Sequence, residues 1–132
     1  MQTVKLIPLL MIFVGISGTF SVLFGAWLVH VGAGLPNLQQ TGLDKALQYQ
    51  FIHTLALFIT LIFYIVQPSK WLITASLSLV FGILLFSGGL YLKILFGLSF
   101  FGKLTPFGGS LLALGWFFIC FASIGLTPKN QS

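Results

Sequence analysis

Charged residues are scarce in this sequence, and acidic residues are almost absent. Of the 132 residues 5% are charged, whereas soluble domains carry about 25%. The basic side chains are six lysines with no arginine, and Asp44 is the single acidic residue. This composition excludes salt-bridge networks and sites built from several carboxylates. It also excludes water as the main solvent of the folded chain.

Cysteine is limited to Cys120, which excludes an intrachain disulfide. Because Cys120 lies in an apolar run, we expect a buried, inert thiol. The net charge of +5 does not predict a nucleic-acid partner, because a phosphate-binding face needs basic residues clustered on a polar surface. The lysines here are single and widely spaced, and they flank apolar runs as charges do at the ends of membrane spans.

Long hydrophobic runs make up most of the chain, and 58% of its residues are hydrophobic. A bilayer core about 30 Å thick requires about 20 apolar residues in a helix. The first run is too long for a signal-peptide core of roughly 7 to 15 residues, so we interpret it as a retained span. Helices of a soluble bundle have a polar face, and these runs have almost none. We predict an all-α integral membrane protein, an antiparallel four-helix bundle in a single domain, residues 1–132, with spans at about 6–31, 46–66, 71–96 and 106–126.

Helix start signals accompany the later three runs. Thr41 and Asp44 have the spacing of a capping box before the second span. Ser69 is a candidate N-cap for the third helix. Thr105 followed by Pro106 predicts a capping hydroxyl with proline in the first helical position.

Small residues recur within the apolar runs at helical spacing. In membranes helices associate by close packing and hydrogen bonding, and small side chains allow their backbones to approach. We therefore expect a small-residue stripe on the first, third and fourth helices, each facing a neighbour. The residues predicted to take part in this packing are Gly18, Gly25, Gly82, Ser87, Gly88, Gly89, Gly108 and Gly115.

The polar residues of the second span are the strongest functional candidates. Tyr49 and His53 are four residues apart, and Gln50 lies three before His53, so we predict one polar patch. His53 is either a neutral imidazole that fixes helix packing or a group that handles protons or binds a ligand. His30 ends the first span, at the membrane interface, and is the weaker candidate.

Metal, cofactor and catalytic sites find little support. Haem ligation requires two axial histidines at one iron, but His30 and His53 are expected at different depths. No tight ligand spacing indicates zinc. No serine lies in a nucleophile-elbow sequence. We expect no cofactor, no metal and no catalytic residue.

Four ordered motifs resemble a known family. They are "GAW" followed by His30, "YQFIHTLA" from Tyr49, "GILLFSGGLYL" from Gly82, and "TPFGG" from Thr105. Together they resemble the transmembrane-protein-256 family, also catalogued as domain of unknown function 423, whose members are small membrane proteins. This chain has Leu28 and Val29 where the family usually has glycine and alanine, and Gly89 where it often has serine. The resemblance implies a four-helix membrane fold and brings no biochemical activity with it.

The predicted function is that of a non-enzymatic accessory protein. We expect it in a bacterial cytoplasmic (inner) membrane, in contact with the lipid bilayer and associated with itself or with a larger membrane complex through glycine-lined helices. The alternative is a small transporter or channel-forming protein that uses the Tyr49, Gln50 and His53 patch. A redox or haem role is a third hypothesis. Lys5 before the first span favours cytoplasmic termini, although the lysines are evenly divided between the two ends: Lys5, Lys70 and Lys129 against Lys45, Lys93 and Lys103.

Overall fold

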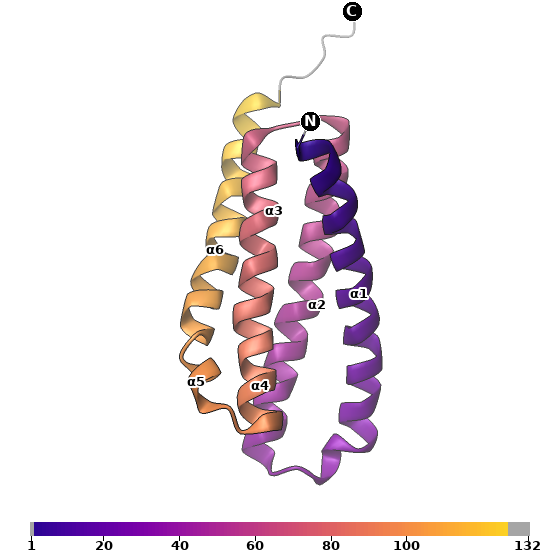
Figure 1. Ribbon diagram of the computed structural model, residues 1–132, viewed down its shortest axis with the longest axis vertical. Coiled ribbons are helices and arrows are strands. Elements are labelled where there is room, and N and C mark those ends of the chain that lie inside the picture. The colour runs from indigo at the N-terminus through magenta and orange to yellow at the C-terminus, as the bar shows by residue number, and fades with distance from the viewer. Residues whose placement is uncertain (1, 127–132) are drawn as a thin grey trace, which may run out of the picture.

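The computed structural model describes residues 2–126, with side chains from Lys5 onward. The described chain is helical with no strand, and four of its helical segments are long and apolar enough to cross a membrane (Figure 1). The two ends of the described chain lie at the same end of the molecule. The predicted antiparallel four-helix membrane fold is confirmed. Lys129 lies outside the described residues.

The helices follow one another with short connections. The main helices are α1 (Gln2–His30), α2 (Asn37–Val66), α3 (Lys70–Ile83), α4 (Gly89–Phe96) and α6 (Thr105–Ala122). The short elements are η1 (Gly32–Gly34), the π-helical turn η2 (Leu84–Gly88), α5 (Ser99–Gly102) and η3 (Ser123–Gly125).

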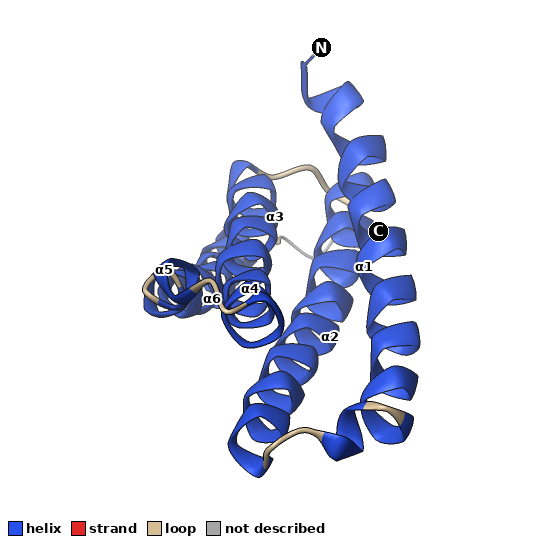
Figure 2. Cartoon of the chain, turned by 60° about the horizontal axis from the view of Figure 1, so that its bottom comes forward, coloured by secondary structure: helices blue, strands red, loops and turns tan. Residues whose placement is uncertain are grey.

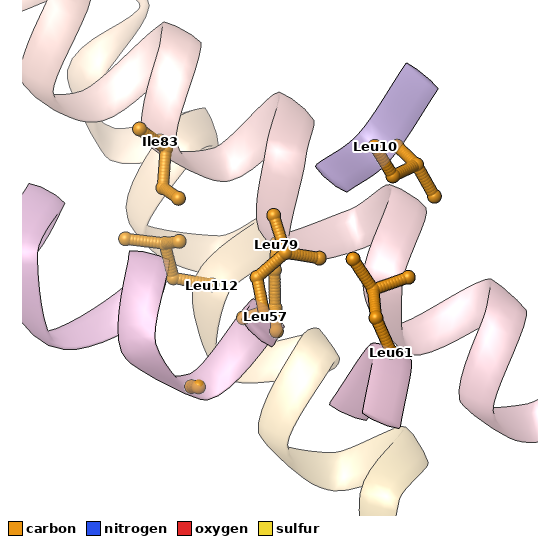
Figure 3. Close-up of a cluster of buried hydrophobic side chains, with 7 residues drawn as sticks. Leu10, Leu57, Leu61, Leu79, Ile83 and Leu112 are labelled. Atoms are coloured by element: carbon orange, nitrogen blue, oxygen red, sulfur yellow. The ribbon is translucent and has the colours of Figure 1, made fainter. Parts of the chain in front are cut away.

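The α2 and α3–α4 helices occupy the centre, and α1 and α6 lie outside them (Figure 1 and Figure 2). The most extensive contact joins α3 to α6, while α1 packs mainly on α2 and α2 on α3. The larger core cluster lies where these helices meet (Figure 3). Its buried residues are Leu10, Ala56, Leu57, Leu61, Leu79, Ile83 and Leu112.

The start of α2 differs from the prediction. The helix begins at Asn37, directly after Pro36, whose extended ψ of 143° separates it from the preceding turn. The Thr41 hydroxyl donates to the Asn37 carbonyl oxygen at 2.9 Å, from inside the helix. The predicted capping box at Thr41 and Asp44 is therefore wrong, because both residues lie in a helix that has already begun.

Of the other two start signals, one is confirmed and one is shifted. Ser69 accepts a hydrogen bond from the Trp71 backbone N–H at 3.2 Å and caps α3 as predicted. Thr105 is already the first residue of α6, after the cap position Leu104, so its predicted capping role is wrong. Within residues 2–126, the Thr105 hydroxyl is the buried side-chain polar atom without a hydrogen-bond partner.

The third membrane crossing changes its winding in the middle. The α3 helix passes through η2 into α4 without a break, and single π turns inside α-helices are frequent at functional sites. The Ser87 hydroxyl donates to the Ala46 carbonyl oxygen of α2 at 2.6 Å. On its other side, η2 receives Gly108 of α6, where an added methyl group would lie 2.7 Å from the Leu85 carbonyl carbon. The turn is thus held between α2 and α6.

Candidate functional site: a buried polar network beside the π turn

A buried hydrogen-bond network connects three helices around Gln50. The Gln50 side-chain amide donates to the Ser17 hydroxyl of α1 at 3.0 Å, and its carbonyl oxygen accepts from the Tyr91 hydroxyl of α4 at 2.7 Å. Ser17 also shares a 2.7 Å hydrogen bond with Thr54, one turn along α2 from Gln50. Ser17, Gln50 and Thr54 are all buried. The network lies near the middle of α1 and α2, where water is not available to replace a lost partner.

The donor and acceptor roles in this network follow from its chemistry. Because Tyr91 donates to the Gln50 carbonyl oxygen, the Gln50 amide group is left to donate to Ser17. The Ser17 hydroxyl can then donate to Thr54, and the order runs from α4 through α2 to α1. None of these groups is a carboxylate or an imidazole, so the network suits hydrogen bonding rather than proton storage near neutral pH.

Tyr49 and His53 have neighbours that differ from those of Gln50. The His53 Nδ1 atom is 2.6 Å from the Tyr49 carbonyl oxygen, and the Tyr49 and His53 rings stack with their centroids 5.6 Å apart. Tyr49 also stacks on Phe86 of η2 at 4.5 Å, and His53 meets the ring of Trp116 of α6 edge-on. Around the helix His53 lies between the other two, about 40° from Tyr49 and about 60° from Gln50, so the neighbouring helices and not the spacing separate them. The structure therefore divides the predicted patch into two groups with different neighbours.

His30 is remote from these groups. It is the last residue of α1 and is exposed, whereas His53 is buried. His53 lies about 24 Å along the α2 axis from Asn37, the first residue of that helix. The two imidazoles therefore lie at different depths, as expected from the sequence. Among the described residues, no three His, Cys, Asp or Glu side chains are grouped as metal ligands would be.

Cys120 is exposed on α6, so the prediction of a buried thiol is wrong. The residue lies on the outer side of an outer helix, where an apolar sequence indicates lipid contact rather than a protein core. Its sulfur lies 3.9 Å from the Trp116 carbonyl oxygen one turn earlier.

The predicted packing glycines fall into two groups. Added methyl groups at Gly82 and Gly115 would lie 2.6 and 2.7 Å from Leu112 and Leu79 respectively, and Gly108 faces the backbone of η2 even more closely. A methyl group at Gly89 would lie 2.8 Å from the Phe101 carbonyl oxygen, and one at Gly25 would lie 3.3 Å from Leu47.

Gly18 and Gly88 differ from that expectation. In the described part of the chain, no atom beyond their own helices lies within 4 Å of a methyl group added at either position. Gly18 is on α1, which packs mainly on α2 and leaves much of its surface uncovered. Gly88 borders a cavity rather than a helix.

A cavity of about 240 Å³ lies between α1 and the η2–α4 segment. Its walls are mostly apolar, and the polar side chains at its edge are members of the network together with Ser87, which is bonded to α2. A dry apolar cavity of about 150 Å³ is large enough for benzene, so this space is sufficient for a small ring or part of a lipid chain. The lining residues include Phe13, Ile16, Ser17, Phe20, Gln50, Ser87, Gly88 and Tyr91.

Tyr91, Ser17 and Thr54 are the network members that were not among the predicted site residues. Ser17 and Tyr91 lie inside long apolar runs, Ser17 close to Thr19 and Ser21, and Tyr91 two residues before Lys93. The signal that could have identified Ser17 and Tyr91 is their position several turns inside a predicted span. A hydroxyl at that depth needs a hydrogen-bond partner, and the polar residues of the second span were the candidates. Which partner each one finds depends on helix rotation, which spacing does not specify.

The comparisons with known proteins agree with this architecture. Residues 23–109 match the family model described as "Protein of unknown function (DUF423)". The chain is 33% identical over 124 residues to the UPF0382 inner membrane protein YgdD of Escherichia coli (strain K12), covering 93% of this chain and 95% of that protein. It is 32% identical over 114 residues to a UPF0382 membrane protein of Haemophilus influenzae, covering 83% and 89% respectively.

No solved structure matches the chain. The family match spans more than half of the sequence, and the Escherichia coli relative aligns with nearly all of it. The four membrane-crossing helices agree with the membrane location in the names of both relatives. The chain therefore belongs to the DUF423 family of membrane proteins, for which no biochemical activity is established.

Proposed function

We propose that this protein is a non-enzymatic accessory component of the membrane that associates with a second copy of itself through the outer face of α1. The observation that carries the proposal is an exposed stripe along that face, at intervals of about one helical turn, made of three small side chains and one valine. Gly15, Thr19, Val22 and Ala26 form this outer α1 stripe, and all four are exposed.

The stripe has the form of a helix-packing surface. A shallow groove runs over Gly15 and Thr19, between the larger side chains of Ile12, Ile16 and Leu23. The Thr19 hydroxyl donates to the Gly15 carbonyl oxygen at 2.8 Å, so the groove carries no unpaired hydroxyl hydrogen into an apolar contact. Small residues allow a second helix to approach closely, which favours association where lipid already solvates large apolar groups.

The outer position of α1 supports this assignment. In the most apolar stretch of α1, 17% of the residues are buried, compared with 39% in that of α2. The glycines of α3 and α6 are less suitable for a partner, because residues of the same chain already occupy the space beside Gly82, Gly108 and Gly115. Of the glycine-lined helices predicted to associate with a partner, the proposal therefore selects α1.

The non-enzymatic part of the proposal rests on the composition of the buried network. Gln50, Ser17 and Tyr91 satisfy one another, and no carboxylate is available to them. A small transporter built on Tyr49, Gln50 and His53 is the alternative. It is less favoured because Gln50 points to α1 and α4, whereas His53 contacts Trp116 of α6.

Native mass spectrometry of the full chain, released from its membrane in mild detergent, tests the proposal. We expect a dimer for the parent protein and a monomer for Gly15→Leu, because leucine fills the groove. Gly34→Leu is the matched control: it makes the same substitution in the η1 loop, also in open space, and is expected to retain the dimer.

Each outcome has a clear meaning. Thermal stability in detergent should be unchanged by Gly15→Leu, since no other part of the described chain lies within 4 Å of a methyl group there. A parent protein that is monomeric without a bound partner, or a Gly15→Leu dimer, would contradict the proposal. A parent mass that includes a different protein, lost in Gly15→Leu, would replace self-association by membership of a larger complex.

A further inference from the structure

At the end of the molecule opposite the termini, the side chain of Lys93 lies against Gly102, the residue before Lys103 (Figure 1). Lys93 is in the last turn of α4, and Lys103 directly follows α5; both are exposed. The single acidic residue, Asp44, lines a groove between α1 and α2, whereas its neighbour Leu43 is buried against α4. The carboxylate thus belongs to another part of this end. The two ammonium groups are left without the chain's one carboxylate beside them.

Gly102 determines where the Lys93 side chain lies. A methyl group at Gly102 would be 2.6 Å from Cδ and 3.3 Å from Cε of Lys93. The aliphatic part of Lys93 therefore runs across the backbone of α5, and its end reaches the residue next to Lys103. Holding two like charges near each other is unfavourable unless an anion lies between them.

The surroundings of the lysine pair are apolar and exposed. Phe96 is 69% exposed, Leu98 45% and Phe100 64%. Apolar side chains beside lysines suit the boundary of a bilayer, where the rings contact lipid chains and each lysine extends its ammonium group toward the headgroups. Such a surface meets headgroups and the first carbons of acyl chains at the same time.

The depth of Lys93 agrees with this position. Lys70 begins the third crossing, and the 23 residues from it to Lys93 correspond to about 35 Å of helix. The hydrocarbon core of a bilayer is about 30 Å thick. If one lysine lies at each boundary of the core, Lys93 is at the level of the lipid phosphates.

We propose that Lys93, Gly102 and Lys103 form a binding site for the phosphate of an anionic phospholipid. The two ammonium groups bind the phosphate, Gly102 provides the space that positions Lys93, and Phe96 and Phe100 contact the acyl chains. The apolar rim selects a lipid over free phosphate. This site is independent of the outer α1 stripe.

The test measures lipid association with the full chain in phosphatidylcholine bilayers. Spin-labelled phosphatidylglycerol and spin-labelled phosphatidylcholine are compared at low salt, where charge interactions are least screened. We expect the parent to prefer phosphatidylglycerol. Lys93→Met and Lys103→Met should each reduce that preference roughly fivefold, the factor for about 1 kcal/mol per lysine. Gly102→Leu should do the same by displacing Lys93.

Two controls separate a site from net charge. Lys70→Met removes a lysine at the opposite interface, where its ammonium lies 5.4 Å from the Trp71 ring centroid, and should leave the preference unchanged. Gly34→Leu repeats the glycine substitution in a loop at the same end of the molecule and should also have no effect.

Three results would overturn the proposal. The first is equal association of the parent protein with both lipids. The second is a loss of preference in Lys70→Met as large as that in Lys93→Met. The third is displacement of the labelled phosphatidylglycerol by millimolar inorganic phosphate, which would mean that the lysines bind free phosphate. If Gly102→Leu does not fold, the two lysine variants decide the question, because both lysines are exposed and methionine keeps an unbranched aliphatic chain in place of each.

Discussion

The two outer helices are attached to the central pair by different physical means. The α3–α6 contact depends on close approach at Gly82, Gly108 and Gly115, with one interhelical hydrogen bond from Ser78 to the Leu111 carbonyl oxygen. The α1–α2 contact depends instead on hydrogen bonds between side chains, centred on Gln50. Both means are available in lipid, where burying apolar surface contributes little. The difference predicts which substitutions each contact tolerates.

Gly108→Ala should have the largest effect. Its methyl group would meet the backbone of Leu85 and Phe86, which cannot move as a side chain can. Overpacking costs typically about 1 to 3 kcal/mol and occasionally more, and we expect the upper part of that range. The measurement is thermal unfolding in detergent, compared with Gly115→Ala, whose methyl group meets the side chain of Leu79 rather than backbone atoms at its closest contacts. An equal or smaller loss for Gly108→Ala would contradict the rigid-contact account.

Gln50→Leu should come next. Leucine leaves Ser17 and the Tyr91 hydroxyl without their shared partner in a region that lacks water. Hydrogen bonds between membrane helices are worth about 0.6 to 1.7 kcal/mol, so we expect a loss of about 1 to 2 kcal/mol. Gln48→Leu, an exposed glutamine two residues earlier, is the control and should change stability little. Equal stability of the two variants would mean that the network does not hold α1.

His53→Leu should have a smaller effect, within about 1 kcal/mol, because its Nδ1 partner is a carbonyl oxygen of its own helix. His53→Asn should be milder still if asparagine retains that hydrogen bond. If His53 handles protons, both variants should instead lose proton flux in liposomes equally, since neither side chain titrates near neutral pH. His30→Leu is the exposed comparison. Unchanged stability and no flux in any of these proteins would leave His53 without an identified role.

Gly18→Ala should be the least harmful change. Beyond its own stretch of α1, the added methyl group meets no atom of the described chain within 4 Å, and alanine is a better helix former than glycine by about 0.5 to 1 kcal/mol. We expect unchanged or slightly raised stability by thermal unfolding, in contrast to Gly108→Ala. A large loss would show that Gly18 lies against a partner that a single chain does not provide.

The sequence by itself determined the membrane fold. Four apolar runs of sufficient length, separated by Pro36, Pro68 and a loop before Pro106, leave few other arrangements. The backbone of each run must satisfy its own hydrogen bonds in lipid, so helices are the only outcome for separate segments of this length. The Ser69 cap was predictable for the same reason, because its signal is local in the chain.

Only the tertiary structure decided how the helices face one another. Helical spacing shows that Tyr49 shares a face with His53, and that Gln50 shares one with Thr54, but it does not state which neighbour covers each face. Likewise, Gly18 and Gly108 are both glycines within apolar runs, and only the rotation of their helices places Gly18 in open space and Gly108 against η2. Rotation is set by side-chain packing between helices distant in the chain, so it follows from the whole assembly and not from any single run.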